Sequence, residues 1–480
     1  MISTWLSNEN NLRRSVSLIR QHARSKRHIP YARGRTELAD HLGIRDRRRM
    51  NANHSRRKGR VLNATAAVVG NTLEWFDILV YATFVSYISA NFFLGDRSVA
   101  TLAALGAFGT SFIIRPIGAV VTGWISDRSG RRTALTITSL LMFVGTGIIA
   151  FLPNHAQIGV AAPILLVTAR LIQGFAAGGE FGSATAYLAE QSHRHRGYFA
   201  SWQFASQGLG VVIAAFFGGV LTAAYSEKEL TDWAWRIPFY FGMLVGPVGY
   251  VIRYHADESP EFVAAKARAA GGSVRPKLSN GFWHRVFAAS ALVVVASASL
   301  HMVISFPTLA TSQFGIERQF GMWTQAYAGM ILLVVTPLSG ALGDRIGRQW
   351  LALASCTALV FAPPALFALL DTAPTTGNAM LAQLVLSLFA ALFLGALAAM
   401  LSDLFVPANR SLGLAVSYNV AVLLGGAFAP LIYAALSVYI GRAAPSYYVS
   451  GAALISLIAV IFIINARWLS EPKPVQGEAL

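Results

Sequence analysis

Twelve long apolar runs, separated by short polar joints, fill the chain from residue 61 onward. A helix needs about 20 apolar residues to cross the hydrocarbon core of a bilayer. The runs cover residues 61–90, 99–121, 133–152, 158–189, 198–224, 234–253, 285–312, 320–341, 349–370, 379–402, 411–438 and 446–467. The sequence therefore predicts an all-α membrane protein with twelve transmembrane helices.

The composition agrees with this prediction and narrows the function. Charged residues make up 13% of the chain and hydrophobic residues 55%, whereas soluble proteins carry about 25% charged residues. The single cysteine, Cys356, lies in an apolar run, so no disulfide can form within the chain. The joints contain no nucleotide-binding loop, metal-ligand cluster or nucleophile elbow. We therefore expect neither an enzyme nor a bound metal or cofactor.

The net charge of +17 belongs mainly to the N-terminal tail. Sixteen of the 39 Lys and Arg residues stand in residues 1–60, and the rest of the chain holds 23 basic and 18 acidic residues. This tail is rich in Arg, Ser, Asn and His and is predicted to be disordered. A solvated tail is favoured over an arm on anionic lipid, and no specific nucleic-acid partner is expected. Met50 is an alternative start, which would leave residues 1–49 untranslated.

The positive-inside rule gives the orientation. With the N-terminus in the cytoplasm, cytoplasmic segments hold 32 Lys and Arg and the opposite joints hold four. Without the tail, the cytoplasmic segments still hold 16 Lys and Arg against four in the opposite joints. The sequence thus predicts a multi-pass protein of the cytoplasmic (inner) membrane, with both termini cytoplasmic.

A repeated motif divides the chain into halves. G-x-x-x-D-R-x-G-R occurs between the second and third runs and again between the eighth and ninth, with the two Asp residues 217 positions apart. Such a repeat predicts two homologous six-helix bundles, at 61–253 and 285–468, joined by a cytoplasmic loop at 254–284 and followed by a tail at 469–480. Two tasks suit the motif: a cytoplasmic gate, in which Asp caps a helix or pairs with Arg, or topological anchoring by Arg. Its residues are Gly123, Asp127, Arg128, Gly130, Arg131, Arg132, Gly340, Asp344, Arg345, Gly347 and Arg348.

Two carboxylates lie deep within the first run. Glu74 and Asp77 are three residues apart, which places them on one face of a helix. An ionisable group at membrane depth is costly and usually faces a polar cavity in which it has a task. The pair predicts a proton or cation site in a transporter.

Four further stretches support a family resemblance. They are Gly70-Asn-Thr-Leu-Glu-Trp-Phe-Asp77, Phe112-Ile-Ile-Arg115-Pro-Ile-Gly118, Arg170-Leu-Ile-Gln-Gly-Phe-Ala-Ala-Gly-Gly-Glu-Phe-Gly182 and Trp235-Arg-Ile-Pro-Phe239. Together with the paired motif they resemble the metabolite:H+ symporter family of the major facilitator superfamily. Its members include citrate, 2-oxoglutarate, shikimate and proline/betaine carriers. Ser201-Trp-Gln-Phe-Ala-Ser-Gln207 looks most like the citrate and tricarballylate carriers.

The first half also carries the buried cations. Arg115 and Arg170 stand within spans, where a guanidinium needs a carboxylate from the protein or from a substrate. Gln173 and Glu180 follow Arg170 along one helical stripe, and Glu180 joins Glu74 and Asp77 as a candidate proton-coupling residue. Gly174, Gly178 and Gly182 form a second stripe, read as close helix packing. Glu190 is read as a solvated helix cap.

Uncharged polar residues complete the predicted substrate site. Gln203 and Gln207 share one face of the fifth span, and their amides suit a hydroxylated or carboxylated solute as well as simple helix-to-helix hydrogen bonding. His301 on the seventh span has an ordinary pKa near 6.5, which suits proton handling or anion contact, although a structural role is the commoner one. Asn419 on the eleventh span is a weaker candidate for the same cavity.

These observations predict a proton-coupled symporter, expected to be monomeric, that imports a small organic acid such as citrate or 2-oxoglutarate. Protons and the lipid bilayer are its other partners. The alternatives are a proline/betaine or shikimate-type symporter, a drug or metabolite efflux carrier, and a non-transporting sensor. Buried arginines count against the efflux carrier. The short chain after Trp468 counts against the betaine carrier.

Overall fold

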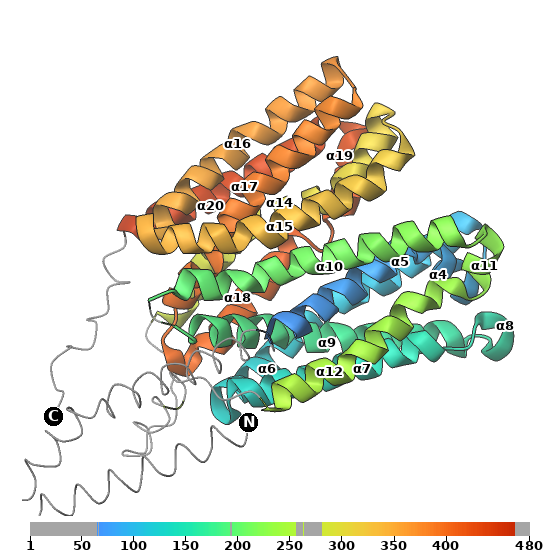
Figure 1. Ribbon diagram of the computed structural model, residues 1–480, viewed down its shortest axis with the longest axis horizontal. Helices are drawn as coiled ribbons and strands as arrows, with labels where there is room; N and C mark the ends of the chain where they lie inside the picture. Colours follow the sequence, from blue (N-terminus) through green and yellow to red (C-terminus); the bar gives the residue numbers. More distant parts are fainter. Residues whose placement is uncertain (1–64, 66, 193, 256–262, 264–280, 466–480) are drawn as a thin grey trace, which may run out of the picture. The chain divides into compact units, whose positions relative to one another are not determined.

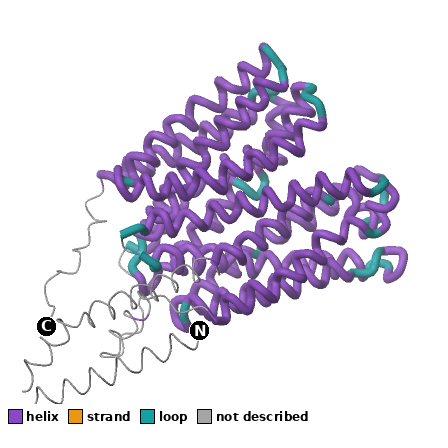
Figure 2. Tube along the Cα trace, in the orientation of Figure 1, coloured by secondary structure: helices purple, strands orange, loops and turns teal. Residues whose placement is uncertain are grey.

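Helices make up nearly all of the computed structural model (Figure 1), which describes residues 65, 67–192, 194–255, 263 and 281–465. The predicted tails at 1–60 and 469–480 and most of the predicted loop at 254–284 lie outside these residues. Figure 2 shows helices joined by short loops, and no strand occurs in the described part of the chain.

The first half begins with a helix at Ala67–Thr83. It continues with α4 (Val85–Phe92), α5 (Arg97–Ile113), α6 (Arg115–Ser129), α7 (Arg131–Phe151), α8 (His155–Ile158), α9 (Ala161–Ala189), α10 (Arg196–Ala224), α11 (Glu227–Asp232), η1 (Ala234–Arg236) and α12 (Ile237–His255). The second half contains α14 (Phe282–Phe314), α15 (Arg318–Ile346), α16 (Arg348–Thr372), α17 (Thr376–Asp403), η2 (Pro407–Asn409), α18 (Arg410–Gly425), α19 (Ala429–Tyr439) and α20 (Ala444–Asn465).

Helices occupy all twelve predicted runs. Within the described residues, nine helices are long and apolar enough to cross a membrane, and the bent pair Ala67–Thr83 and Val85–Phe92 makes a tenth candidate. Shorter helices fill the other two runs: α12 the sixth, and α18 with α19 the eleventh. The fold class is thus confirmed as an all-α, multi-pass membrane protein.

Two of the predicted spans are broken, and a third is interrupted at a single residue. The first bends by 69° between Thr83 and Val85. The second is interrupted at Ile114, near Pro116, which has no N–H to donate to the hydrogen-bond ladder, but residues Ala103–Ser129 still form one candidate span. The eleventh breaks after Gly425, between α18 and α19. Hydropathy alone does not reveal such breaks, because they leave the apolar run uninterrupted.

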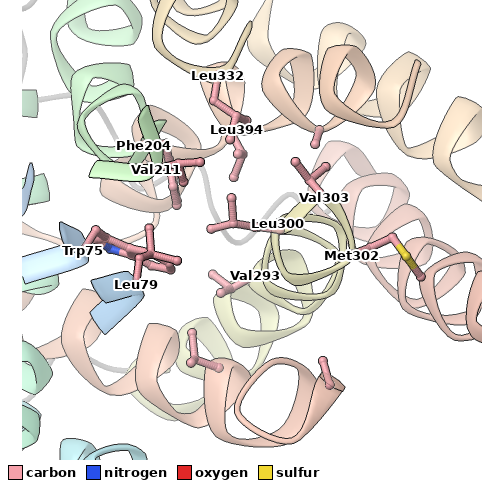
Figure 3. Packing of buried hydrophobic residues seen from close by; sticks show 14 of the residues in the cluster. Trp75, Leu79, Phe204, Val211, Val293, Leu300, Met302, Val303, Leu332 and Leu394 are labelled. Carbon is pink, nitrogen blue, oxygen red and sulfur yellow. The ribbon is translucent and has the colours of Figure 1, made fainter. Parts of the chain in front are cut away.

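The two halves meet along helices from opposite halves of the sequence. α10 packs along α15, and α18 packs against both α6 and α9. The α10–α15 contact is close, because a Cβ at Gly208 would lie 2.7 Å from the carbonyl oxygen of Gly329. Figure 3 shows side chains of both halves in one apolar cluster, with Phe204 and Val211 of α10 and Leu300 of α14 among them.

Candidate functional site

The centre of the site is an ion pair between the first helix and α6. Arg115 is the first residue of α6, so the break at Ile114 places its side chain within the bundle. Its Nη2 lies 3.7 Å from Oε1 of Glu74, and the side chains are only 3% and 4% exposed. The guanidinium also lies over the ring of Phe112, 4.5 Å from its centroid. Because both charges are buried, loss of either one would leave the other unpaired, which is costly.

A second arginine is linked to the second acid through two neutral side chains. Arg170 on α9 donates from Nη1 to Oε1 of Gln173 at 2.8 Å. Gln173 donates from Nε2 to Oγ1 of Thr146 at 3.0 Å, and the Thr146 hydroxyl donates to Oδ2 of Asp77. All four side chains are buried. Thr146, on α7, was not among the predicted site residues, since a lone threonine in an apolar run carries no distinguishing pattern.

Both arginines and Asp77 line one small cavity. Its volume is about 10 Å³, and Asp77, Arg115, Arg170 and Gln173 are among the residues around it. A cavity of this size holds about one water molecule, so a substrate requires the helices to separate. Oδ1 of Asp77 is buried without a hydrogen-bond partner. A buried carboxylate oxygen without a partner can take up a proton or accept a hydrogen bond from a ligand.

Gln203 belongs to a clamp between the first helix and α10. Its Nε2 donates to Oδ1 of Asn71 at 2.9 Å, and Asn71 Nδ2 donates back to the Gln203 carbonyl at 2.8 Å and to Ser206 Oγ at 2.6 Å. The predicted alternative, hydrogen bonding between helices, describes this contact. Gln207 is one turn further along α10, and its buried amide lies beside the hydroxyl of Tyr418. This position suits either task predicted for it, contact with a substrate or hydrogen bonding between helices.

The second half contributes neutral groups near Arg115. His301 on α14 and Tyr418 on α18 both lie close enough to Arg115 to interact with it electrostatically. Nδ1 of His301 lies 2.8 Å from the carbonyl oxygen of Ser297. Asn419, by contrast, points across the interface, where Nδ2 donates to the carbonyl oxygens of Gly178 and Ala415 at 2.7 Å. Asn419 thus ties α18 to α9, while its Oδ1 stays without a partner.

Glu180 lies apart from the arginines. It is ten residues beyond Arg170 on α9, about 15 Å along the helix axis, and its Oε2 accepts a hydrogen bond from Thr138 at 3.2 Å. The glycine stripe behaves as predicted. A Cβ at Gly174 or Gly178 would lie 2.1 or 2.2 Å from a backbone oxygen of α5 or α6. Only glycine permits these helices to approach so closely.

A first latch joins the halves at the end of the helices that carries the repeated motif, called here the motif end. The carboxylate of Asp127 accepts from the backbone N–H groups of Ser411 and Leu412, at 3.3 and 3.0 Å, and pairs with Arg131 at 3.0 Å. Those N–H groups form the N-terminus of α18, where a negative charge is favourable. Asp127 therefore caps a helix of the other half.

A second latch repeats this arrangement. Asp344 on α15 accepts from the backbone N–H groups of Gly197 and Tyr198, at 2.8 and 3.0 Å, at the N-terminus of α10. Arg348 pairs with Asp344 at 2.7 Å. Both predicted features of the motif, helix capping and pairing with arginine, are confirmed in each half.

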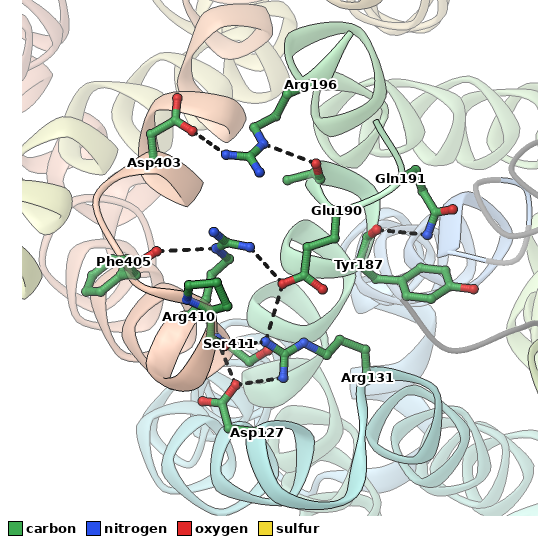
Figure 4. A network of polar contacts seen from close by, with 12 residues as sticks. Asp127, Arg131, Tyr187, Glu190, Gln191, Arg196, Asp403, Phe405, Arg410 and Ser411 are labelled. Carbon is green, nitrogen blue, oxygen red and sulfur yellow. Dashed lines mark hydrogen bonds and ion pairs between the residues drawn. The ribbon is translucent and has the colours of Figure 1, made fainter. Parts of the chain in front are cut away.

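Each latch includes a further acid and a further arginine that the sequence did not reveal. In the first, Glu190 lies between Arg131 and Arg410, at 3.4 and 2.8 Å (Figure 4). In the second, Asp403 lies between Arg348 and Arg196. The side chain of Glu190 is 0% exposed, so its interpretation as a solvated cap was wrong. Arg196 and Arg410 are 214 positions apart, close to the repeat of 217, and this spacing could have identified them.

The motif glycines have two geometric tasks. Gly130 and Gly347 have φ of 109° and 100°, which favours glycine at these sharp corners between helices. A Cβ at Gly123 would lie 2.9 Å from the backbone of Leu412, and one at Gly340 would lie 2.5 Å from the carbonyl oxygen of Gly197. The remaining motif arginines differ: Arg128 is exposed and lies over the ring of Trp124, and Arg345 is exposed. Arg132 is partly buried on α7.

Comparisons with known proteins place the chain in a family. Residues 62–273 match the model for "Sugar (and other) transporter" and residues 290–479 that for "Major Facilitator Superfamily". The citrate-proton symporter of Klebsiella pneumoniae is 33% identical over 412 residues, covering 85% of this chain and 92% of that protein. The chain belongs to the major facilitator superfamily. This superfamily consists of transporters, which confirms that the chain is not an enzyme.

Other members of the superfamily widen the comparison. The proline/betaine transporter of Escherichia coli K12 is 31% identical over 430 residues, covering 86% of this chain and 84% of that protein. The proton:xylose symporter XylE, solved with 6-bromo-6-deoxy-D-glucose, matches with a TM-score of 0.70 at 18% identity, covering 85% of this chain and 95% of that chain. At this low sequence identity, the match to XylE supports the fold alone. The citrate-proton symporters confirm the predicted resemblance to the metabolite:H+ symporter family.

Proposed function

We propose that this transporter is a proton-coupled symporter that imports a small organic acid, of the citrate or 2-oxoglutarate type, by alternating access. The observation that carries the proposal is the presence of two buried arginines, each connected to a buried carboxylate, around one cavity. Arginine binds a carboxylate through two parallel hydrogen bonds. Each guanidinium can therefore exchange the protein's carboxylate for that of a substrate.

Protonation supplies the coupling step. A proton on Glu74 removes the charge that holds Arg115, which lies 3.7 Å away. A proton on Asp77 has the same effect on Arg170 through the chain of Thr146 and Gln173. The freed arginine then binds a substrate carboxylate, and the site is again without an unpaired charge. A neutralised site is less costly to carry through the apolar interior while the two halves change their arrangement.

The choice of an organic acid over a betaine rests on the aromatic rings. A quaternary ammonium group is recognised by open aromatic faces. Here the rings of Phe112 and Tyr81 lie under Arg115 and Arg170, with each guanidinium carbon 4.5 Å from the ring centroid. Phe181 and Tyr418 stack on one another at 3.5 Å. The rings beside the arginines are thus covered by cations, which favours an anion over a cation at this site.

Proline or betaine transport remains the second candidate function, because a proline/betaine transporter is 31% identical to the chain. In that case Glu74 or Asp77 would face the positive end of a zwitterion and one arginine its carboxylate. The same uptake experiment distinguishes the two candidates.

The motif end is assigned to the cytoplasm by the excess of Lys and Arg on that side. We propose that the two latches hold this end closed while the helices separate at the opposite end to admit substrate from the outside. Their opening would release substrate into the cell. In the same proposal the protein resides in the cytoplasmic membrane and has both termini in the cytoplasm.

The test is uptake of labelled citrate, 2-oxoglutarate and betaine into proteoliposomes, with and without an inside-alkaline pH gradient. We expect the gradient to stimulate uptake of an organic acid, and Arg115→Ala to abolish this uptake. Glu229→Gln, an exposed acid on α11, is the matched control and should transport as wild type. Gradient-driven uptake of betaine alone would establish the second candidate, and uptake of the acid that ignores the gradient would refute proton coupling.

A further inference from the structure

The charges around the cavity constrain the ionic form of the substrate. The cations are Arg115 and Arg170, and the acids paired or linked to them are Glu74 and Asp77, so the four groups sum to zero when all are ionised. Each is at most 4% exposed. A net charge left in such an interior is costly. Any substrate charge must therefore be balanced by protons taken up at the same site.

We infer that the transporter carries its substrate as a dianion together with two protons, one on Glu74 and one on Asp77, in an electroneutral step. This inference rests on the proposed function. The structure holds two links between an arginine and an acid: the direct Arg115–Glu74 pair, and the chain from Arg170 through Gln173 and Thr146 to Asp77. Each link provides one site at which a substrate carboxylate can replace the acid. Two substrate carboxylates would bind the two arginines in place of Glu74 and Asp77, and two protons would neutralise these two displaced acids.

A third carboxylate would lack a cation. The second-half residues nearest Arg115 are His301 and Tyr418, and Gln207 on α10 offers an uncharged amide. These groups suit a hydroxyl, a keto oxygen or a protonated carboxyl. A tricarboxylate such as citrate therefore fits best with one carboxyl protonated, and 2-oxoglutarate fits with both of its carboxylates ionised.

The other ionisable groups of the described part do not change this balance. Around the two acids, the titratable and charged groups of the packed elements are Tyr81 on the first helix, Arg115 on α6, Arg170 and Glu180 on α9, His301 on α14 and Tyr418 on α18. Of these, Glu180 is the one other carboxylate, and its Oε2 accepts a hydrogen bond from Thr138. α7 faces Asp77 with neutral Thr146.

The test measures accumulation of labelled 2-oxoglutarate in proteoliposomes against the size of the imposed pH gradient. Two coupled protons predict about a 100-fold change in the accumulation ratio per pH unit, and one proton about tenfold, since each proton contributes about 1.36 kcal/mol per unit. A potassium diffusion potential should have no effect. If net charge moved, each unit charge would change accumulation about 50-fold per 100 mV, which corresponds to about 2.3 kcal/mol.

Citrate provides the comparison of ionic forms. At a fixed gradient, its initial uptake rate should fall more steeply than that of 2-oxoglutarate as the external pH rises, because a higher pH removes coupled protons in both cases but also ionises the third carboxyl of citrate. A rate that follows the citrate trianion, a tenfold slope or a strong dependence on potential would overturn the inference while leaving the symporter intact. Failure of every carboxylate to accumulate would instead overturn the proposed function.

Variants of the two acids test which residues bind the two coupled protons. Asp77→Asn and Glu74→Gln should each lower the slope from about 100-fold to about tenfold per pH unit, and an inside-negative potential should then oppose uptake. Glu180→Gln tests the remaining buried acid of the first half, which the sequence predicts as a third proton-coupling residue and which accepts a hydrogen bond from Thr138. It should keep the wild-type slope. A lower slope in Glu180→Gln would show that the second proton resides there and would overturn the assignment.

Discussion

Replacing Asp127 should open the motif end. Its carboxylate accepts two backbone hydrogen bonds from α18 and pairs with Arg131, with distances of 3.0 to 3.3 Å. A hydrogen bond to a charged group contributes about 1.5–3 kcal/mol, and part of this is regained from water when the helix end is exposed. We therefore expect Asp127→Ala to shift the equilibrium between the closed and open forms of the motif end toward the open form by about 3 kcal/mol, or about 100-fold. Asp127→Asn keeps one acceptor oxygen and should produce a smaller shift.

The assay is a pulsed electron resonance measurement of the distance between two spin labels. Suitable positions are Ser129, at the end of α6, and Ile346, at the end of α15, because both are exposed at the motif end and belong to opposite halves. The lone buried cysteine is first removed by Cys356→Ala. Asp127→Ala should add a longer distance to the distribution, whereas Asp232→Asn, an exposed acid on α11, should not. An unchanged distribution in Asp127→Ala would refute the latch.

Three further predictions concern packing and the second latch. Asp344→Ala should widen the same label distance, because Asp344 caps α10 as Asp127 caps α18; a wild-type distribution would show that the latches are not equivalent. Gly178→Ala should lower the free energy of unfolding by about 1–3 kcal/mol through overpacking, since its Cβ would lie 2.2 Å from the Arg115 carbonyl oxygen. This is measured by thermal unfolding in detergent, and Gly451→Ala, with open space around it, should not destabilise. Asn71→Ala should cost about 1–3 kcal/mol, because it leaves Gln203 with an unsatisfied buried amide; unfolding that matches wild type would contradict this.

The sequence was sufficient for the architecture. Apolar runs of the required length determine how many helices cross the membrane, and most described spans lie within a few residues of their predicted bounds, although the second ends at Ser129 rather than at residue 121. The repeated motif also indicated that Asp127 and Asp344 would have corresponding helix-capping contacts. The glycine stripe of α9 was also correctly interpreted, because GxxxG spacing has one common physical cause.

The site was predicted in part. The pairing of Arg115 with Glu74 had been expected as one of two alternatives, since a buried cation needs a buried anion. Thr146 and Asn71 were missed, because a neutral polar residue acquires a role only from its partners on other helices. The buried position of Glu190 depends on Arg410, which lies 220 residues away, so it could not be read from neighbouring residues.

The central claim is that Glu74 and Asp77 couple protons to substrate. Its most direct test is the double variant Glu74→Gln, Asp77→Asn, measured in proteoliposomes by exchange of labelled 2-oxoglutarate across the membrane and by accumulation driven by a pH gradient. Because both arginines remain, we expect exchange to persist while gradient-driven accumulation is lost. Accumulation at the wild-type level in the double variant would contradict the account.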